Sequence, residues 1–201
     1  KVIAIKMTRL HLDRLADIAL TEKEQEGETA QQRDISGAFS LKDVAFRYAS
    51  NDPLLFNGLN LEVKAGESVA IIGPSGTGKT TLLKLMLGLL PLEAGKVEAD
   101  GVDIKHLGLR HYRQQIAAVM QEDALMSGTL AENISFFDSQ MDMQKVMACA
   151  QLAGIHQDIA AMQMGYNALI GDMGSSLSGG QKQRVLLARA LYRQPKILFM
   201  D

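Results

Sequence analysis

The chain has 201 residues, of which 47% are hydrophobic and 22% charged, so it can form one good core and is too apolar to be disordered. Its 21 basic and 23 acidic side chains give a formal net charge of −2, which argues against nucleic acid as a partner. The one cysteine, Cys149, excludes an intramolecular disulfide and a cysteine-rich zinc site. No apolar run reaches the roughly 20 residues that a transmembrane helix needs.

The first 35 residues differ in pattern from the rest of the chain. Residues 1–20 carry apolar side chains at helical spacing, which predicts a helix with one apolar stripe. Residues 21–35 are polar and rich in glutamate near their start, which is typical of a linker. The chain begins with Lys1 rather than Met and stops at Asp201 directly after an apolar run. We therefore expect it to be a piece of a longer protein.

From about residue 36 the pattern changes to short strands separated by turns. Alternating apolar residues predict strands over 39–48 and 59–63. Residues 68–72 form a continuous apolar run, which indicates a strand buried on both faces of a parallel sheet. A helix is expected over 81–90.

The second half of the chain continues the alternation of strands and helices. Strands are expected over 96–99, 116–120 and 197–200, with a mostly helical region over 129–165 and a helix over 179–193. This order predicts an α/β fold.

Residues 73–80 read Gly-Pro-Ser-Gly-Thr-Gly-Lys-Thr and fit the pattern G-x-x-x-x-G-K-S/T. They stand between the expected strand and helix, as this motif requires. Glycines let the backbone N–H groups turn inward around an anion, and the following helix directs its positive end at the same place. Lys79 adds a positive charge near the terminal phosphates, and the hydroxyl of Thr80 can bind Mg²⁺. The motif therefore predicts a site for nucleotide phosphates.

A second motif, Leu-Ser-Gly-Gly-Gln, occupies residues 177–181 and precedes the last expected helix. Ser178 is a good N-cap, and the two glycines after it leave backbone N–H groups open at the helix start. The chain therefore has a second helix end that can bind an anion.

Together the two motifs make the chain resemble the nucleotide-binding domain of ATP-binding cassette (ABC) transporters over residues 36–201. GPSGTGKT resembles the family's P-loop, and LSGGQ matches its signature sequence letter for letter. The resemblance implies a P-loop NTPase sheet with an antiparallel β subdomain and a helical signature subdomain, incomplete at the C-terminus. It also implies ATP and Mg²⁺ as cofactors.

The resemblance assigns roles to individual residues. Tyr48 resembles the aromatic residue that stacks on adenine, Gln121 the Q-loop glutamine that contacts Mg²⁺ and the attacking water, and Asp201 the Walker B aspartate that supports Mg²⁺. Lys79, Gln121 and Asp201 are therefore the catalytic candidates, and Thr80, Gln121 and Asp201 the candidate metal ligands. Nucleotide contacts are also implied for Gly73, Ser75, Gly76, Thr77, Gly78, Lys79, Thr80, Thr81, Ser178, Gly179, Gly180 and Gln181.

One departure from the family pattern bears on activity. The family places a catalytic glutamate directly after the Walker B aspartate and a switch histidine further on, whereas this sequence stops at Asp201. The full-length parent is therefore expected to hydrolyse ATP, and this piece to turn it over slowly or not at all.

Further stretches resemble exporters. Residues 121–134 resemble the exporter pattern Q-x-x-x-L-F-x-G-T-I-x-E-N-I, and residues 171–174 resemble a short exporter loop. Residues 14–18, before the acidic linker, resemble bacterial exporters of the colicin V or bacteriocin type, which carry an N-terminal peptidase domain. Residues 1–20 would then extend the last transmembrane helix into the cytoplasm.

The implied function is ATP-driven export of a substrate, such as a peptide or bacteriocin, across the bacterial inner membrane, with this domain at the cytoplasmic face. The implied partners are a second copy of the domain in a head-to-tail ATP sandwich, the transmembrane domain of the same chain and the transported substrate.

Alternative functions are a soluble ABC-type ATPase and a degenerate regulatory cassette without transport. A chromosome-maintenance ATPase is disfavoured because no heptad repeat separates the P-loop from the signature. The exporter-like stretch over 121–134 disfavours a soluble translation factor. The residue after Asp201 would separate an active from a degenerate site.

Overall fold

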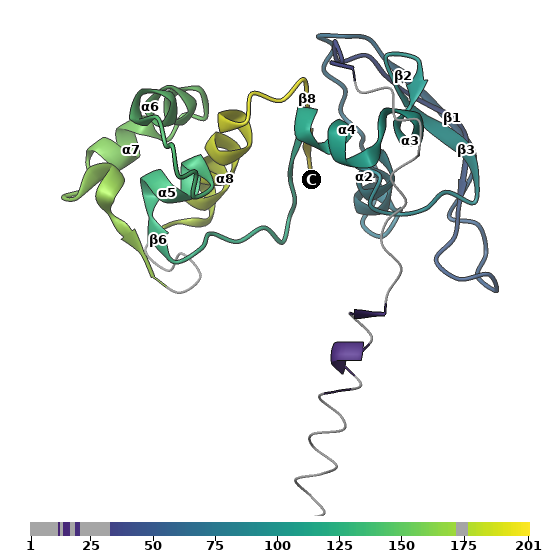
Figure 1. Cartoon of the computed structure of the whole chain (residues 1–201), viewed down its shortest axis with the longest axis horizontal. Helices are drawn as coiled ribbons and strands as arrows, with labels where there is room; N and C mark the ends of the chain where they lie inside the picture. The colour runs from purple at the N-terminus through teal and green to yellow at the C-terminus, as the bar shows by residue number, and fades with distance from the viewer. Residues whose placement is uncertain (1–11, 13, 17–18, 21–32, 172–176) are drawn as a thin grey trace, which may run out of the picture.

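The computed structural model describes residues 12, 14–16, 19–20, 33–171 and 177–201. The predicted helix over 1–20 and the linker over 21–35 lie largely outside this range. Residues 33–171 and 177–201 form two lobes, one built around an antiparallel sheet and one mainly helical (Figure 1). In the part of the chain that is described, no helix is both long and apolar enough to cross a membrane.

The first lobe contains a four-stranded antiparallel sheet in the order β2-β1-β3-β4. Its strands are β1 (Phe39–Phe46), β2 (Phe56–Val63), β3 (Ala94–Ala99) and β4 (Val102–Asp103). Pairing of β1 shifts register around Asp43, which has a φ of 49°, and this irregularity explains the loose alternation in the sequence. Gly95 passes so close to the backbone of Asp43 that a side chain there would clash.

Three helices complete this lobe: α2 (Lys79–Met86), α3 (Ile104–Leu107) and α4 (Leu109–Gln115). Apolar residues of β1 and α2 form most of its core, joined by others from β3, α3, α4 and β5: Phe39, Leu41, Val44, Phe46, Leu82, Leu83, Leu85, Met86, Val97, Ile104, Leu107, Tyr112 and Ile116. This packing fixes the start of α2, and with it the P-loop, against the sheet.

A parallel pair of strands lies beside this core. β5 (Ile116–Val119) pairs with β8 (Ile197–Met200), with Ile116 opposite Ile197 and Val119 opposite Met200. The ring of Phe199 contacts Phe39 edge to face at 5.7 Å between centroids. The pairing brings the carboxyl ends of two strands far apart in the sequence to one edge.

The predicted strand over 68–72 is not formed. The structure assigns no regular element to these residues, and Val69, Ile71 and Ile72 are 47%, 44% and 91% exposed. A strand needs a neighbour that accepts and donates its backbone hydrogen bonds, and no strand of the described residues pairs with this segment. The interpretation of 68–72 as a buried strand is therefore wrong for this structure, although the segment still leads into the P-loop.

The second lobe is mainly helical (Figure 1). It comprises β6 (Gly128–Thr129), α5 (Leu130–Ser135), α6 (Met143–Leu152), α7 (His156–Ala160), the 3-10 helix η1 (Gly165–Asn167), β7 (Leu169–Ile170) and α8 (Gly179–Tyr192). Its separate core includes Leu130, Ile134, Val146, Cys149, Ala150, Ile155, Ile159, Ile170, Val185, Leu186 and Ala188. The helical region expected over 129–165 and the helix expected over 179–193 are both confirmed.

Candidate nucleotide-binding site

The P-loop presents an uncapped helix start. Gly76 and Gly78 have φ angles of 81° and 92°, a conformation that residues with a side chain rarely adopt. No side chain caps α2, and its first turn carries no acidic residue. The first backbone N–H groups of α2 therefore meet no side-chain acceptor, which suits the binding of an anion.

Lys79 lies folded into the P-loop. Its Nζ donates hydrogen bonds to the carbonyl oxygens of Gly73, at 2.9 Å, and Pro74, at 2.7 Å. The hydroxyl of Thr77 donates to the same Pro74 oxygen at 2.9 Å. Neutral carbonyls do not compensate the charge of Lys79, and no salt bridge of the described residues includes it. A phosphate group would supply that compensation.

The structure brings Thr80 and Asp201 together across 121 residues of sequence, with Thr80 Oγ1 donating to Asp201 Oδ2 at 2.7 Å. Pairing between β5 and β8 produces this contact, since the N–H of Asp201 donates to Val119 O at 3.0 Å and continues the ladder. Gln121 follows β5 at the same edge and is exposed. No hydrogen bond of the described residues joins Gln121 to Thr80 or Asp201.

Thr80 and Asp201 can supply part of the ligand shell of a Mg²⁺ ion that also binds the phosphates of a nucleotide. Nowhere in residues 33–171 or 177–201 do three His, Cys, Asp or Glu side chains gather as a cage for a metal. Mg²⁺ in nucleotide sites usually takes only one or two carboxylates and completes its shell with phosphate oxygens and water. The hydroxyl of Thr80 and the carboxylate of Asp201 supply such a partial set.

Tyr48 lies beside the same loop. Its hydroxyl shares a hydrogen bond of 2.6 Å with Thr81 Oγ1, and its ring contacts Phe46 edge to face at 5.0 Å. Thr81 is buried, whereas Tyr48 is 64% exposed. The hydroxyl therefore ties the ring to α2 while much of the side chain stays open to solvent, where it can stack on a base.

The signature motif forms a capping box at the start of α8. Ser178 Oγ accepts from the N–H of Gln181 at 3.3 Å, and Gln181 Oε1 accepts from the N–H of Ser178 at 3.0 Å. The predicted N-cap at Ser178 is confirmed. Gly179 and Gly180 are exposed, and a Cβ built on Gly179 would meet no atom of the described residues within 4 Å. The first turn of α8 is thus open to a ligand from outside the lobe.

The signature and the P-loop of one chain lie apart. Figure 1 shows α2 and α8 in different lobes, and no hydrogen bond or salt bridge within residues 33–171 and 177–201 joins the two motifs. The structure therefore gathers Tyr48, Lys79, Thr80, Thr81 and Asp201 at one place and leaves Ser178–Gly179–Gly180–Gln181 at another.

Sequence reasoning missed Asp158, which contacts the signature from α7. Its Oδ1 accepts from Gln181 Nε2 at 3.0 Å and its Oδ2 from Arg184 Nη2 at 3.1 Å. These hydrogen bonds, first that from Gln181, hold the pKa of the Asp158 carboxyl below its ordinary value. No local sequence pattern predicts the contact of Asp158 with Gln181, because the contact spans 23 positions and exists only in the folded lobe.

The P-loop at the start of α2, with Asp201 beside it and a capped Ser-Gly-Gly-Gln turn on a helical lobe, defines an ATP-binding domain of the P-loop class. The family model described as ABC transporter matches residues 56–201, and the chain belongs to this family. The predicted family and α/β fold class are confirmed.

Two Escherichia coli proteins and one solved structure are similar to the chain. The chain is 48% identical over 202 residues to MchF, a probable microcin secretion/processing ATP-binding protein, and 46% identical over 202 residues to the colicin V secretion/processing ATP-binding protein CvaB. Each alignment covers 100% of this chain and 29% of the relative. The structure of a bacterial Atm1-family ABC exporter with ATP bound matches 98% of this chain and 35% of that chain, with a TM-score of 0.87 and 32% identity. The chain therefore spans less than a third of the length of these curated relatives.

Proposed function

We propose that the chain binds ATP with Mg²⁺ and, within a longer bacterial exporter, powers the export of a peptide such as a bacteriocin across the inner membrane. The observation that carries the proposal is the contact of Thr80 with Asp201 directly beside Lys79 of the P-loop. The secretion functions in the names of the colicin V and microcin relatives support the choice of cargo.

Within one copy of the chain, different residues would bind different parts of the nucleotide. The N–H groups of the P-loop and Lys79 hold the phosphates, Tyr48 stacks on the adenine, and Thr81 lies at the start of α2 beside them. Thr80 and Asp201 hold Mg²⁺, which supplies charge neutralisation at the phosphates when it is bound. Gln121, which follows β5 at the same sheet edge, would orient the attacking water.

The separation of the two motifs supports a dimeric site. Because the signature of one chain lies apart from its own P-loop, we place the nucleotide between the P-loop of one copy and the exposed glycine turn of a second copy, arranged head to tail. Hydrolysis then belongs to the assembled pair, and a single copy of the chain turns over ATP slowly or not at all.

We place the domain on the cytoplasmic face of the inner membrane, attached to a transmembrane domain of the same polypeptide. In this arrangement residues 1–20 extend the last transmembrane helix, residues 21–35 link it to the domain, and residues 36–201 bind the nucleotide. Closing and opening of the ATP sandwich would move the transmembrane domain and its cargo.

Lys79→Ala tests the proposal in the purified full-length protein. Calorimetric titration with ATP and Mg²⁺ should show saturable binding that Lys79→Ala weakens at least about tenfold, because a charge-assisted contact to phosphate is lost. Lys84→Ala is the matched control, since Lys84 is an exposed lysine in the last turn of the same helix. Equal binding by wild type and Lys79→Ala would contradict the proposed phosphate site, and a wild type that does not hydrolyse ATP would contradict ATP-driven transport.

A further inference from the structure

Gln181 has a partner outside its own motif. Its amide uses both ends: Oε1 accepts from the N–H of Ser178, and Nε2 donates to Asp158 on α7. An ionised carboxylate only accepts hydrogen bonds, so Asp158 selects the amide orientation that leaves Oε1 facing Ser178. The capping box of the signature therefore depends on a residue of another helix.

Asp158 also holds a second residue of α8. Its Oδ2 accepts from Arg184 Nη2 at 3.1 Å, and Arg184 Nη1 lies 3.6 Å from the position of a Cβ on Gly180. The Nε of Arg184 is buried and has no hydrogen-bond partner among the residues that the structure describes. The Asp158–Arg184 pair thus supports the glycine turn from the side that faces the lobe.

The helix that carries Asp158 is firmly anchored. Ile155, the N-cap residue of α7, and Ile159 on the helix are both 0% exposed. His156 Nδ1 shares a hydrogen bond of 2.7 Å with the hydroxyl of Tyr166 on η1. The carboxylate is therefore held by the core of the lobe and not by the segment that it contacts.

We propose that Asp158 is a positioning residue of the ATP site, which holds the Ser-Gly-Gly turn of the signature in the geometry that a nucleotide on a second copy requires. The proposal rests on the proposed function, because the signature acts only when the ATP sandwich forms. Asp158 does not touch the nucleotide and acts through Gln181 and Arg184.

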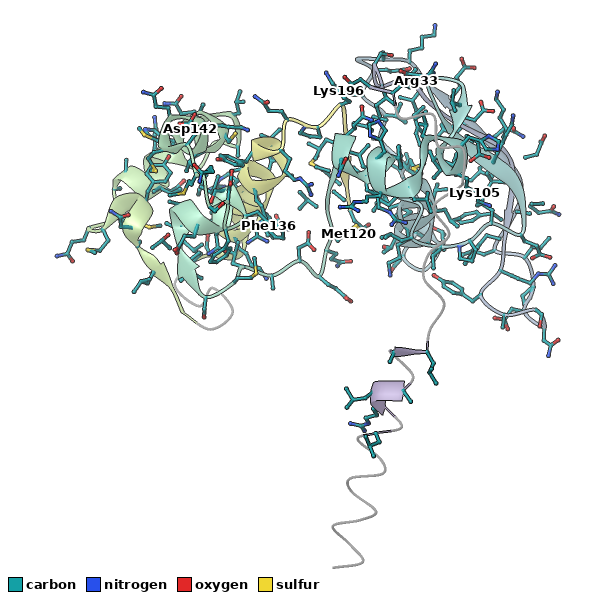
Figure 2. All side chains as sticks on the ribbon, in the orientation of Figure 1. Arg33, Lys105, Met120, Phe136, Asp142 and Lys196 are labelled. Carbon is teal, nitrogen blue, oxygen red and sulfur yellow. The ribbon has the colours of Figure 1, made fainter. Side chains whose placement is uncertain are left out.

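Asp158→Ala in the full-length protein separates this role from a general loss of stability. The kcat of ATP hydrolysis should fall about tenfold, while the affinity of each P-loop for ATP should change less than about twofold, because the P-loop lies in the other lobe. Asp142→Ala is the matched control. Asp142, labelled in Figure 2, also accepts backbone hydrogen bonds at a helix start in the same lobe, from Gln144 and Lys145. No hydrogen bond or salt bridge of the described residues joins Asp142 to the signature.

Two further measurements test whether Asp158 acts on ATP hydrolysis through the signature motif. Amide hydrogen exchange over residues 177–184 should become faster in Asp158→Ala and stay unchanged in Asp142→Ala. In a double-mutant cycle, Asp158→Ala should add little to Gln181→Ala, because the two residues act in series. Asp158→Asn keeps one acceptor oxygen for Gln181 and should lose less activity than Asp158→Ala.

The outcomes separate the two proposals. A wild type with ATPase activity and an unchanged kcat in Asp158→Ala, or the same loss in Asp142→Ala, overturns the role of Asp158 alone. An inactive wild type overturns the proposed function, and hydrogen exchange then decides whether Asp158 orders the signature. If Asp158→Ala does not fold, a lower kcat at constant ATP affinity in Asp158→Asn supports the role, and wild-type kcat in that variant overturns it.

Discussion

Glu98 on β3 shows how a charge is accommodated inside the antiparallel sheet. It is only 2% exposed, and its carboxylate lies between the ammonium groups of Lys42, at 2.6 Å, and Lys96. Hydrogen bonds from Lys42 and then Lys96 hold the pKa of Glu98 below its ordinary value, against the opposing effect of burial. The charged form is therefore the one that the fold stabilises.

Glu98→Gln should lower the free energy of unfolding by about 2 kcal/mol near neutral pH, because hydrogen bonds to a charged group are lost. A lowered folded pKa contributes stability that is complete above the unfolded value and is lost as the pH falls through the folded value. The difference between wild type and variant should therefore shrink below about pH 4.5. Urea unfolding at neutral and acidic pH measures it, with Glu62→Gln, an exposed residue of β2 in the same sheet, as the control. A difference in stability that grows as the pH falls would contradict the conclusion that the fold lowers the pKa of Glu98.

At the scale of elements, two helix starts follow from short local patterns. Thr129 Oγ1 accepts from the N–H of Glu132 at 3.1 Å, and Glu132 Oε2 accepts from the N–H of Thr129 at 2.7 Å, which makes a capping box at α5. Ser178 and Gln181 repeat the arrangement at α8. Each box needs only residues three apart, so the sequence suffices to locate the start of both helices.

Thr129→Ala should lower the free energy of unfolding by about 1 kcal/mol, because the helix loses its cap. Thr129→Ser keeps the hydroxyl and should stay within about half of that loss. Thermal unfolding followed by circular dichroism measures both variants. Equal stability of Thr129→Ala and wild type would show that the cap contributes nothing in this lobe.

At the scale of the whole molecule, Asn133 connects the segment that leaves the first lobe to the helical lobe that it enters. The side chain is fully buried and makes four hydrogen bonds: Oδ1 accepts from Met126 N and Arg189 Nη2, and Nδ2 donates to Met126 O and Thr129 O. Arg189 lies on α8 and also donates to Ala124 O. The segment between β5 and α5 is thereby tied to the helix that carries the signature.

Asn133→Ala should lower the free energy of unfolding by about 3 kcal/mol, because the part-buried backbone groups of Met126 and the guanidinium of Arg189 lose their hydrogen bonds to a fully buried side chain. Asn60→Ala is the control: Asn60 also bonds Asp43 and Gly58, but these groups are exposed to water. It should cost less than about 1 kcal/mol. Urea unfolding compares the two, and similar losses would contradict the importance of burial at Asn133.

Much of the fold could be predicted because its signals are local. The spacing of apolar residues located β1, β5, β8 and α8, and the glycines with Lys79 and Thr80 marked the P-loop at the start of α2. Such signals survive in the sequence because a turn, a cap or one face of a helix depends on residues a few positions apart.

Other features needed tertiary structure. Residues 68–72 read as a buried strand, yet a strand exists only where a neighbour completes its hydrogen bonds. The contact of Thr80 with Asp201 was expected only through family resemblance, and that of Asp158 with Gln181 was not expected at all. The sequence by itself determined which residues can bind a nucleotide, because that depends on local chemistry. Only the tertiary structure decided which of them meet, because packing sets the distances between segments that are remote along the chain.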